Sequence, residues 1–125
     1  MKVLERYSGE CAEGTPEAIE DWKTCMTNEF GKDCDFVDCT DMTELQYKMT
    51  VDDMNRMNSW ASVKNPRGYI GSVIDNRAEE LGFTRDYLTF EYSSGNMRSH
   101  GFIKGKKGIV VKGNVETGEI TVKED

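Results

Sequence analysis

The chain has 125 residues, of which 37% are hydrophobic and 31% are charged, and its formal net charge is −7. Five Phe, five Tyr and two Trp side chains exclude a disordered chain, and the length suffices for a core without staples, so we expect a single domain over residues 1–125. No apolar run opens the chain and no stretch is long enough to span a bilayer, which predicts a cytoplasmic protein without membrane contact.

The first third of the chain predicts a strand, a helix and a second strand. Residues 2–7 alternate imperfectly and are expected to be extended. Over residues 15–31 the pattern is helical, because Thr15 can cap and Pro16 suits the first turn. Apolar side chains of that segment recur at spacings of three and four, forming one stripe of Ile19, Trp22, Met26 and Phe30. Residues 34–39 are expected to be a short strand.

The middle of the chain is ambiguous at first and then helical. Residues 43–51 alternate in hydrophobicity, which favours a strand and leaves a helix open. From Thr50 a helix is better supported, because Asp53 follows three residues later as in a capping box. Asn65-Pro66 is typical of the start of the next helix, which we expect to close at Leu81-Gly82.

After this helix the sequence favours strands. Aromatic and β-branched residues over 83–92, 97–104, 108–115 and 119–123 are separated by glycine-rich turns, which predicts a four-stranded antiparallel meander. We therefore expect an α+β fold, with helices packed on one face of a mostly antiparallel sheet and a β-meander at the C-terminus.

Charge is distributed unevenly along the chain. Residues 1–53 carry 14 acidic and 5 basic side chains, residues 54–115 carry 5 and 10, and residues 116–125 carry 4 and 1. The C-terminal half therefore has a basic character that the total charge conceals.

The cysteines do not have the spacing of a metal site. Without an export signal, reduced thiols are expected. Zinc sites usually combine two tight ligand pairs, whereas the one histidine, His100, is distant from all four thiols. We expect no metal and no cofactor at Cys11, Cys25, Cys34 and Cys39.

The most unusual stretch is "SSGNMRSHGFIKGKKG", residues 93–108. On a strand Arg98 and His100 point to the same face, Lys104 follows on that face, and Asn96 precedes them. Cationic donors beside glycine backbone are typical of an anion site. The alternative is a solvated strand that ends in a basic turn.

Two further groups of residues are candidates for the same site. An aromatic residue beside an arginine, as in Phe83 and Arg85, can stack a base and hold a phosphate; alternatively, Phe83 packs beneath the helix end. Arg56 and Arg67 flank the start of the helix at Asn65, where the helix dipole attracts anions, or serve only in capping and solvation.

Three function classes remain open. His100 is the only histidine available as a base, but Ser99 points to the opposite face of the strand and no hydrolase motif is present, so we expect no enzyme. The first class is a protein that binds a phosphorylated ligand. The second is an acidic inhibitor that mimics nucleic acid, of the anti-restriction or anti-CRISPR type, and the third is a small nucleotide-acting enzyme that uses His100.

The layout of "NPRGYIGSVIDNRAEELGFTRDYLTFEY" (65–92) and "SGNMRSHGF" (94–102) resembles that of the phage Thoeris anti-defence sponge proteins. The resemblance implies non-catalytic capture of a cyclic ADP-ribose-like immune signal in the host cytoplasm. It also implies a homo-oligomer, and it favours Phe83, Asn96 and Arg98 as ligand contacts.

The expected mechanism is therefore tight binding of a small phosphorylated nucleotide, without direct nucleic-acid binding. Arg98, with Arg56 or Arg67, would neutralise phosphates. Phe83 would stack a base, and Asn96 would read a ribose or base edge. The remaining candidate contacts are Arg85, His100 and Lys104.

Overall fold

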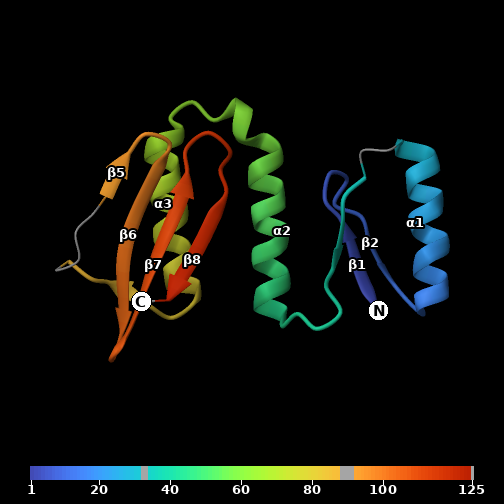
Figure 1. The fold of residues 1–125 in the computed structure, drawn as a ribbon, viewed down its shortest axis with the longest axis horizontal. Coiled ribbons are helices and arrows are strands. Elements are labelled where there is room, and N and C mark those ends of the chain that lie inside the picture. The colour runs from blue at the N-terminus through green and yellow to red at the C-terminus, as the bar shows by residue number, and fades with distance from the viewer. Residues whose placement is uncertain (32–33, 88–91, 125) are drawn as a thin grey trace. The chain divides into compact units, whose positions relative to one another are not determined.

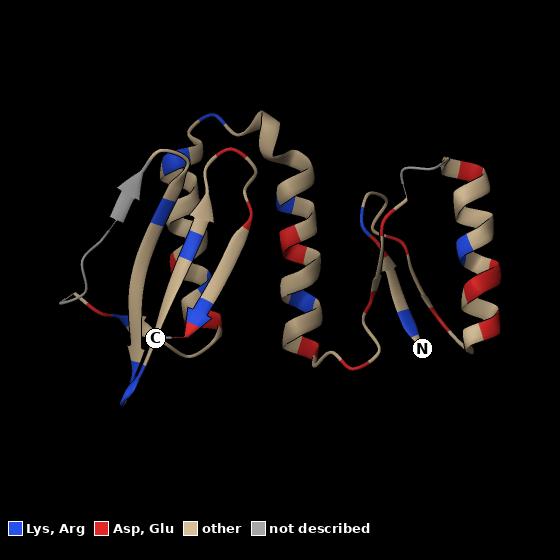
Figure 2. Ribbon diagram, in the orientation of Figure 1, with Lys and Arg blue, Asp and Glu red and all other residues tan. Residues whose placement is uncertain are grey.

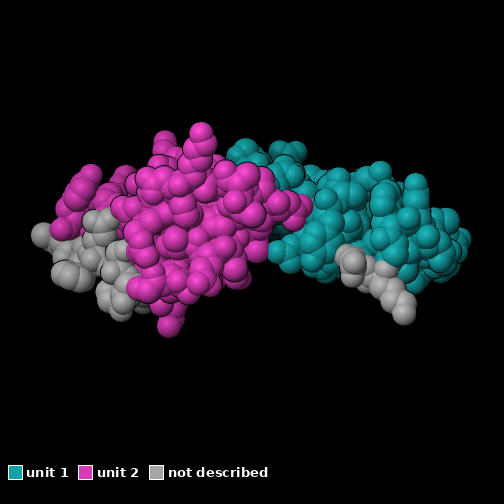
Figure 3. Space-filling model, turned by 90° about the horizontal axis from the view of Figure 1, so that it is seen from above, with its two compact units in different colours: residues 1–55 teal, residues 56–125 magenta. Residues whose placement is uncertain are grey.

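The computed structural model describes residues 1–31, 34–87 and 92–124 (Figure 1). These residues form helices and two antiparallel sheets, joined by turns and loops, which confirms the α+β class and the C-terminal meander. The chain divides into two compact units, Met1–Asn55 and Arg56–Asp125 (Figure 3). The single domain expected from the length stays a prediction.

The N-terminal unit is built on a three-stranded sheet. Strands β2 (Cys11–Glu13) and β3 (Phe36–Asp38) both pair antiparallel with the central strand β1 (Lys2–Glu5). Val3 and Leu4 point to opposite faces of β1, and each is only 1% exposed, so both faces of this sheet are covered. The strands expected over 2–7 and 34–39 are confirmed at Lys2–Glu5 and Phe36–Asp38.

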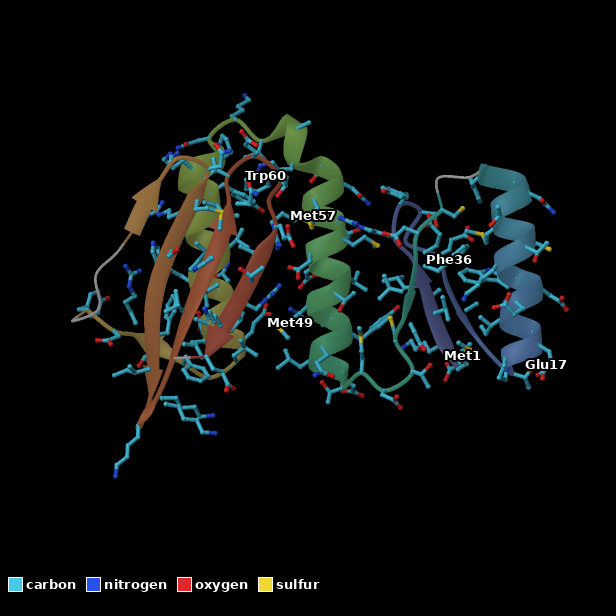
Figure 4. The ribbon with its side chains drawn as sticks, viewed as in Figure 1. Met1, Glu17, Phe36, Met49, Met57 and Trp60 are labelled. Atoms are coloured by element: carbon cyan, nitrogen blue, oxygen red, sulfur yellow. The ribbon has the colours of Figure 1, made fainter. Side chains whose placement is uncertain are left out.

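Helix α1 (Pro16–Phe30) covers the face of Val3, and the rings of Trp22 and Phe36 meet edge-on with centroids 5.6 Å apart (Phe36 is labelled in Figure 4). Its start is as predicted, because Thr15 Oγ1 accepts a hydrogen bond from the Ala18 N–H at 3.2 Å. The apolar stripe is confirmed at Ile19 and Met26, which are buried. It ends before Phe30, which is 53% exposed.

The other face of the sheet packs on α2 (Glu44–Ser59), through a cluster of Leu4, Cys39 and Met54. The prediction of a strand over 43–51 was therefore wrong, and the alternative prediction of a helix is confirmed. The capping box also lies earlier than expected: the Gln46 N–H donates to Thr43 Oγ1 at 3.1 Å, and the Thr43 N–H donates back to Gln46 Oε1 at 2.9 Å. This reciprocal pair starts the helix ahead of Thr50.

In the C-terminal unit, helix α3 (Pro66–Glu80) packs on one face of the second sheet, as predicted. Asn65 Oδ1 accepts from the Gly68 N–H at 3.3 Å and caps this helix. Ile70, Ile74 and Ala78 recur every fourth residue and are fully buried. The core of the unit also contains Trp60, Phe102, Ile109 and Val111.

The second sheet has the strand order β4 (Thr84–Arg85), β6 (Met97–Lys104), β7 (Lys107–Asn114), β8 (Ile120–Glu124), and β5 (Tyr92–Ser94) also pairs with β6. All of these pairings are antiparallel. The strand expected over 83–92 is confirmed at its two ends, whereas residues 88–91 lie outside the described part of the chain.

A short 3-10 helix, η1 (Trp60–Ser62), joins α2 to the start of α3. The Trp60 indole N–H donates to the Val115 carbonyl oxygen at 2.7 Å, and the ring lies against Gly118, where a Cβ would come within 2.6 Å of it (Trp60 is labelled in Figure 4). This residue therefore ties the helical segment to the β7–β8 turn. Among the described residues, no helix is long and apolar enough to cross a membrane.

Candidate anion-binding site

Helix α3 and strand β6 meet along a polar seam beside the apolar core. On the helix, Arg67, Gly71 and Asp75 follow one another at intervals of four residues and so share one face. On the strand, Arg98 and His100 alternate with outward residues and face α3, because the next residue in their row, Phe102, is in the core beneath that helix. Two different periodicities thus bring these five residues together.

Two hydrogen bonds hold Arg98 in this seam. Its Nη1 donates to the Arg67 carbonyl oxygen at 3.0 Å and its Nε donates to His100 Nε2 at 3.1 Å. Gly71 supplies the space, since a Cβ on that residue would lie 2.6 Å from Nη1. The guanidinium therefore lies against the helix backbone in a fixed orientation.

His100 is 2% exposed and both of its ring nitrogens are engaged. Arginine Nε can only donate, so His100 Nε2 accepts from Arg98, and the ring proton is assigned to Nδ1. Nδ1 lies 3.0 Å from Asp75 Oδ1 and donates to it. This assignment makes the imidazole neutral and fixes its tautomer.

Asp75 also holds Arg85, whose Nη1 lies 3.3 Å from the same Oδ1 atom. Arg85 Nη1 also lies 2.9 Å from His100 Nδ1. Both of these nitrogen atoms are donors, so they do not bond to each other; the Asp75 carboxylate accepts from both and holds them together. The Arg85 guanidinium also lies 5.7 Å from the centroid of the Phe102 ring and 5.9 Å from that of Tyr87.

We call Arg67, Asp75, Arg85, Arg98 and His100 the arginine cluster. The guanidinium groups of Arg85 and Arg98 lie beside one carboxylate and one imidazole, and Arg67 contributes its backbone carbonyl oxygen. The Asp75 side chain is 51% exposed and that of Arg85 is 22% exposed, so the cluster is reached from solvent at this edge. A phosphate or another oxyanion fits this arrangement of planar, partly desolvated donors.

Four of the eight residues predicted to bind a ligand converge in the cluster, namely Arg67, Arg85, Arg98 and His100. Asn96 is exposed in the neighbouring β5–β6 turn, where the Arg67 guanidinium donates to the Gly95 carbonyl oxygen. Arg67 thereby connects this turn to the start of α3.

The other three predicted residues lie elsewhere in the C-terminal unit. Phe83 packs against the core cluster, as its alternative interpretation held. Arg56 Nε donates to the Gly118 carbonyl oxygen at 2.9 Å and so supports the β7–β8 turn. Lys104 is exposed six residues along β6 from Arg98, about 20 Å away along the strand.

Sequence reasoning missed Asp75 and Gly71. Both act on β6 from another element, so no pattern within residues 93–108 points to them. The sequence signal that was available is helical spacing: Gly71 and Asp75 follow Arg67 by four and eight residues and so lie on the same helix face.

The N-terminal unit has a different chemistry. It carries 14 acidic and 5 basic side chains over Met1–Asn55, a net charge of −9, whereas Arg56–Asp125 carries 9 and 11, a net charge of +2. Figure 2 shows acidic bands along α1 and basic bands on β6, β7 and β8. Partners of opposite charge therefore suit the two units.

All four cysteines are free, and no group of three or more metal-ligating His, Cys, Asp or Glu side chains occurs within residues 1–31, 34–87 and 92–124. Burial raises the pKa of the Cys39 thiol, with the nearby Cys11 thiol as a further cause. A hydrogen bond with Cys11, together with burial, raises the pKa of Tyr47 to about 12. The Cys39 thiol and the Tyr47 phenol are therefore neutral at pH 7, which makes these two groups poor nucleophiles.

Comparison with protein-family models, with curated proteins and with solved structures finds no match for the chain.

Proposed function

We propose that the protein binds a small phosphorylated nucleotide at the arginine cluster and holds it without chemical conversion. The observation that carries this proposal is the convergence of Arg85 and Arg98 around Asp75 and His100, with Arg98 held by the Arg67 carbonyl oxygen. Two neighbouring guanidinium groups are typical of phosphate recognition, because each presents planar donors that match two oxyanion oxygens.

The affinity would come from groups that are already oriented. Arg98 is fixed by the Arg67 carbonyl oxygen and by His100, so little side-chain entropy remains to be lost on binding. Each charge-assisted hydrogen bond to a phosphate contributes roughly 1.5–3 kcal/mol. Tyr87, which is 88% exposed beside Arg85, takes the base-stacking role that was expected of Phe83.

The absence of conversion is inferred from His100. A general acid or base must reach the proton that it transfers, directly or through one water. His100 is 2% exposed, and its Nε2 and Nδ1 atoms are occupied by Arg98 and Asp75. Its role in the proposal is to orient Arg98.

The biological role in this proposal is sequestration of a cyclic ADP-ribose-like signal in a host cytoplasm, which would block immune signalling. This part of the proposal, together with a homo-oligomeric state, is supported by the resemblance of residues 65–102 to the phage sponge proteins.

The test is a thermal-shift and calorimetric screen of the protein with cyclic ADP-ribose, ADP-ribose, ADP and inorganic phosphate. Binding raises the apparent stability by an amount set by the ligand concentration over Kd. We expect at least one nucleotide to bind and to be recovered unchanged by chromatography after heat denaturation. Arg98→Ala should weaken binding about tenfold or more, whereas Lys123→Ala, an exposed cation on β8, should not. Binding that is equal in both variants, or conversion of the nucleotide, contradicts the proposal.

A second candidate is favoured by the net charge of −9 on the N-terminal unit. An acidic surface of this kind suits an inhibitor that imitates nucleic acid for a basic host protein. Charge reversal at Glu17, Glu20 and Asp21 on α1 would then abolish capture of that host protein, and Arg98→Ala would leave it intact. If the protein instead binds a nucleotide, Arg98→Ala should weaken nucleotide binding, and the charge reversals on α1 should leave it intact.

A further inference from the structure

A hollow of about 330 Å³ lies in the N-terminal unit, between the β1–β2 turn and the end of α1. Its lining is mostly apolar and consists of Glu5, Tyr7, Ser8, Phe30 and Cys34. Tyr7 is 60% exposed and Phe30 is 53% exposed, so two large aromatic side chains remain in solvent around the same hollow. Exposed apolar side chains that gather at one place, rather than singly, indicate a binding surface.

A buried carboxylate lies at this hollow. Glu5 is 2% exposed, and the backbone N–H groups of Tyr7, Ser8 and Asp35 donate to its two oxygens at 2.9 to 3.1 Å. Burial raises the pKa of Glu5, but these hydrogen bonds outweigh burial and hold the pKa below its ordinary value. The side chain is therefore ionised at neutral pH.

This negative charge has no cationic partner within residues 1–31, 34–87 and 92–124. Buried charges are normally paired, because removing an ion from water is costly. The one arginine next to Glu5 in sequence, Arg6, instead pairs with Asp35 at 3.4 Å. A cation in the hollow would thus meet a carboxylate that is not paired with any cationic side chain of the described residues.

We propose that this hollow binds a small organic ammonium ion, with the charge toward Glu5 and the hydrocarbon part against Tyr7 and Phe30. Aromatic rings attract cations to their faces, and the Arg6 guanidinium already lies 5.9 Å from the Tyr7 ring centroid. The volume is at the lower end of small-molecule sites, and the net charge of −9 on the unit raises the local concentration of cations. This site is separate from the arginine cluster and does not depend on nucleotide binding.

The test is an NMR titration of the isotope-labelled protein with benzylammonium at pH 7. We expect saturable shifts of the Tyr7, Ser8 and Asp35 amide signals, because these groups donate to Glu5. Benzyl alcohol has the same size and no charge, and it should leave these signals in place at equal concentration. Equal shifts with the alcohol would mean that only apolar surface is recognised, and no shift with benzylammonium would mean that there is no site; either result overturns the proposal.

Variants separate charge recognition from folding. Glu5→Gln should weaken benzylammonium binding about tenfold or more, and Phe30→Ala should weaken it about threefold. Tyr69→Ala, which removes a 49% exposed aromatic ring from the C-terminal unit, is the matched control and should bind as the wild type does. If Glu5→Gln does not fold, the exposed pair Phe30→Ala and Tyr7→Ala decides: wild-type affinity in both overturns the proposal.

Discussion

The Arg98 guanidinium lies against Gly71 of α3, at a point where any side chain would come within 2.6 Å of Nη1. A glycine in the middle of a helix costs about 1 kcal/mol relative to alanine, so its presence needs a compensating reason. Here the reason is space: the absent Cβ lets a strand cation lie on the helix backbone.

Gly71→Ala should therefore separate stability from binding. The alanine favours the helix by about 1 kcal/mol, but it pushes the flexible end of Arg98 out of the seam. We expect the free energy of unfolding in urea to change little and the affinity for a phosphorylated nucleotide to fall about fivefold or more. Ser72→Ala, at an exposed position of the same helix, is the control and should leave affinity unchanged. Unaltered affinity in Gly71→Ala would show that the position of Arg98 is irrelevant.

Asp75→Asn should change charge while keeping shape. The variant loses the ion pair with Arg85 and the charge-assisted bond with His100, so we expect the free energy of unfolding to fall by about 1 kcal/mol. Because one negative charge leaves the cluster, the affinity for phosphate should rise and its salt dependence should steepen. Calorimetry at two salt concentrations measures this effect, with Glu116→Gln as the control. Weaker phosphate binding in Asp75→Asn would contradict the electrostatic argument.

Glu5 predicts a pH dependence of stability. Its pKa is lower in the folded chain than the ordinary value of 4.5, so its contribution is fully present above pH 4.5 and is lost as pH falls through the lowered value. Glu5→Gln leaves backbone N–H groups poorly satisfied and should cost about 2 kcal/mol at pH 7. Urea unfolding at pH 7, 5, 4 and 3 should show the difference from wild type shrinking only below about pH 4.5. A difference that is constant over this range would count against an ionised Glu5.

Thiol reactivity should follow burial. Cys11 and Cys25 are exposed, whereas Cys39 is 2% exposed and burial raises its pKa. In the native protein at pH 8, iodoacetamide should modify Cys11 and Cys25 first and Cys39 last, as measured by peptide mass spectrometry. In urea the rates should converge. Early modification of native Cys39 would contradict its place in the core.

Much of the fold could be predicted from the sequence where the signals are local. Thr15 and Asn65 cap helices with their own side chains, and prolines follow both, so neighbouring residues decide these starts. The 43–51 segment was harder, because Leu45, Tyr47, Met49 and Val51 alternate by chance. The packing of Tyr47 and Val51 beside Met54, a helical spacing, decides the outcome.

The candidate site was predictable on β6 and only partly beyond it. Strand alternation places Arg98 and His100 together, and this needs no knowledge of the rest of the fold. Asp75 reaches them from α3 across a sequence distance of 25 residues, which depends on how the helix docks on the sheet. The role of Phe83 was ambiguous from the sequence, because an aromatic side chain that follows a helix can either pack in the core or stack on a ligand.

The chain has two tryptophans, and each unit contains one: Trp22 beside Phe36, and Trp60 beside Gly118. Trp22→Phe and Trp60→Phe thus each leave a single tryptophan, in one unit or the other, whose emission can be excited apart from that of the tyrosines. Coincident emission changes of the two proteins during denaturation would reveal one cooperative transition, and staggered changes would reveal two halves that melt independently.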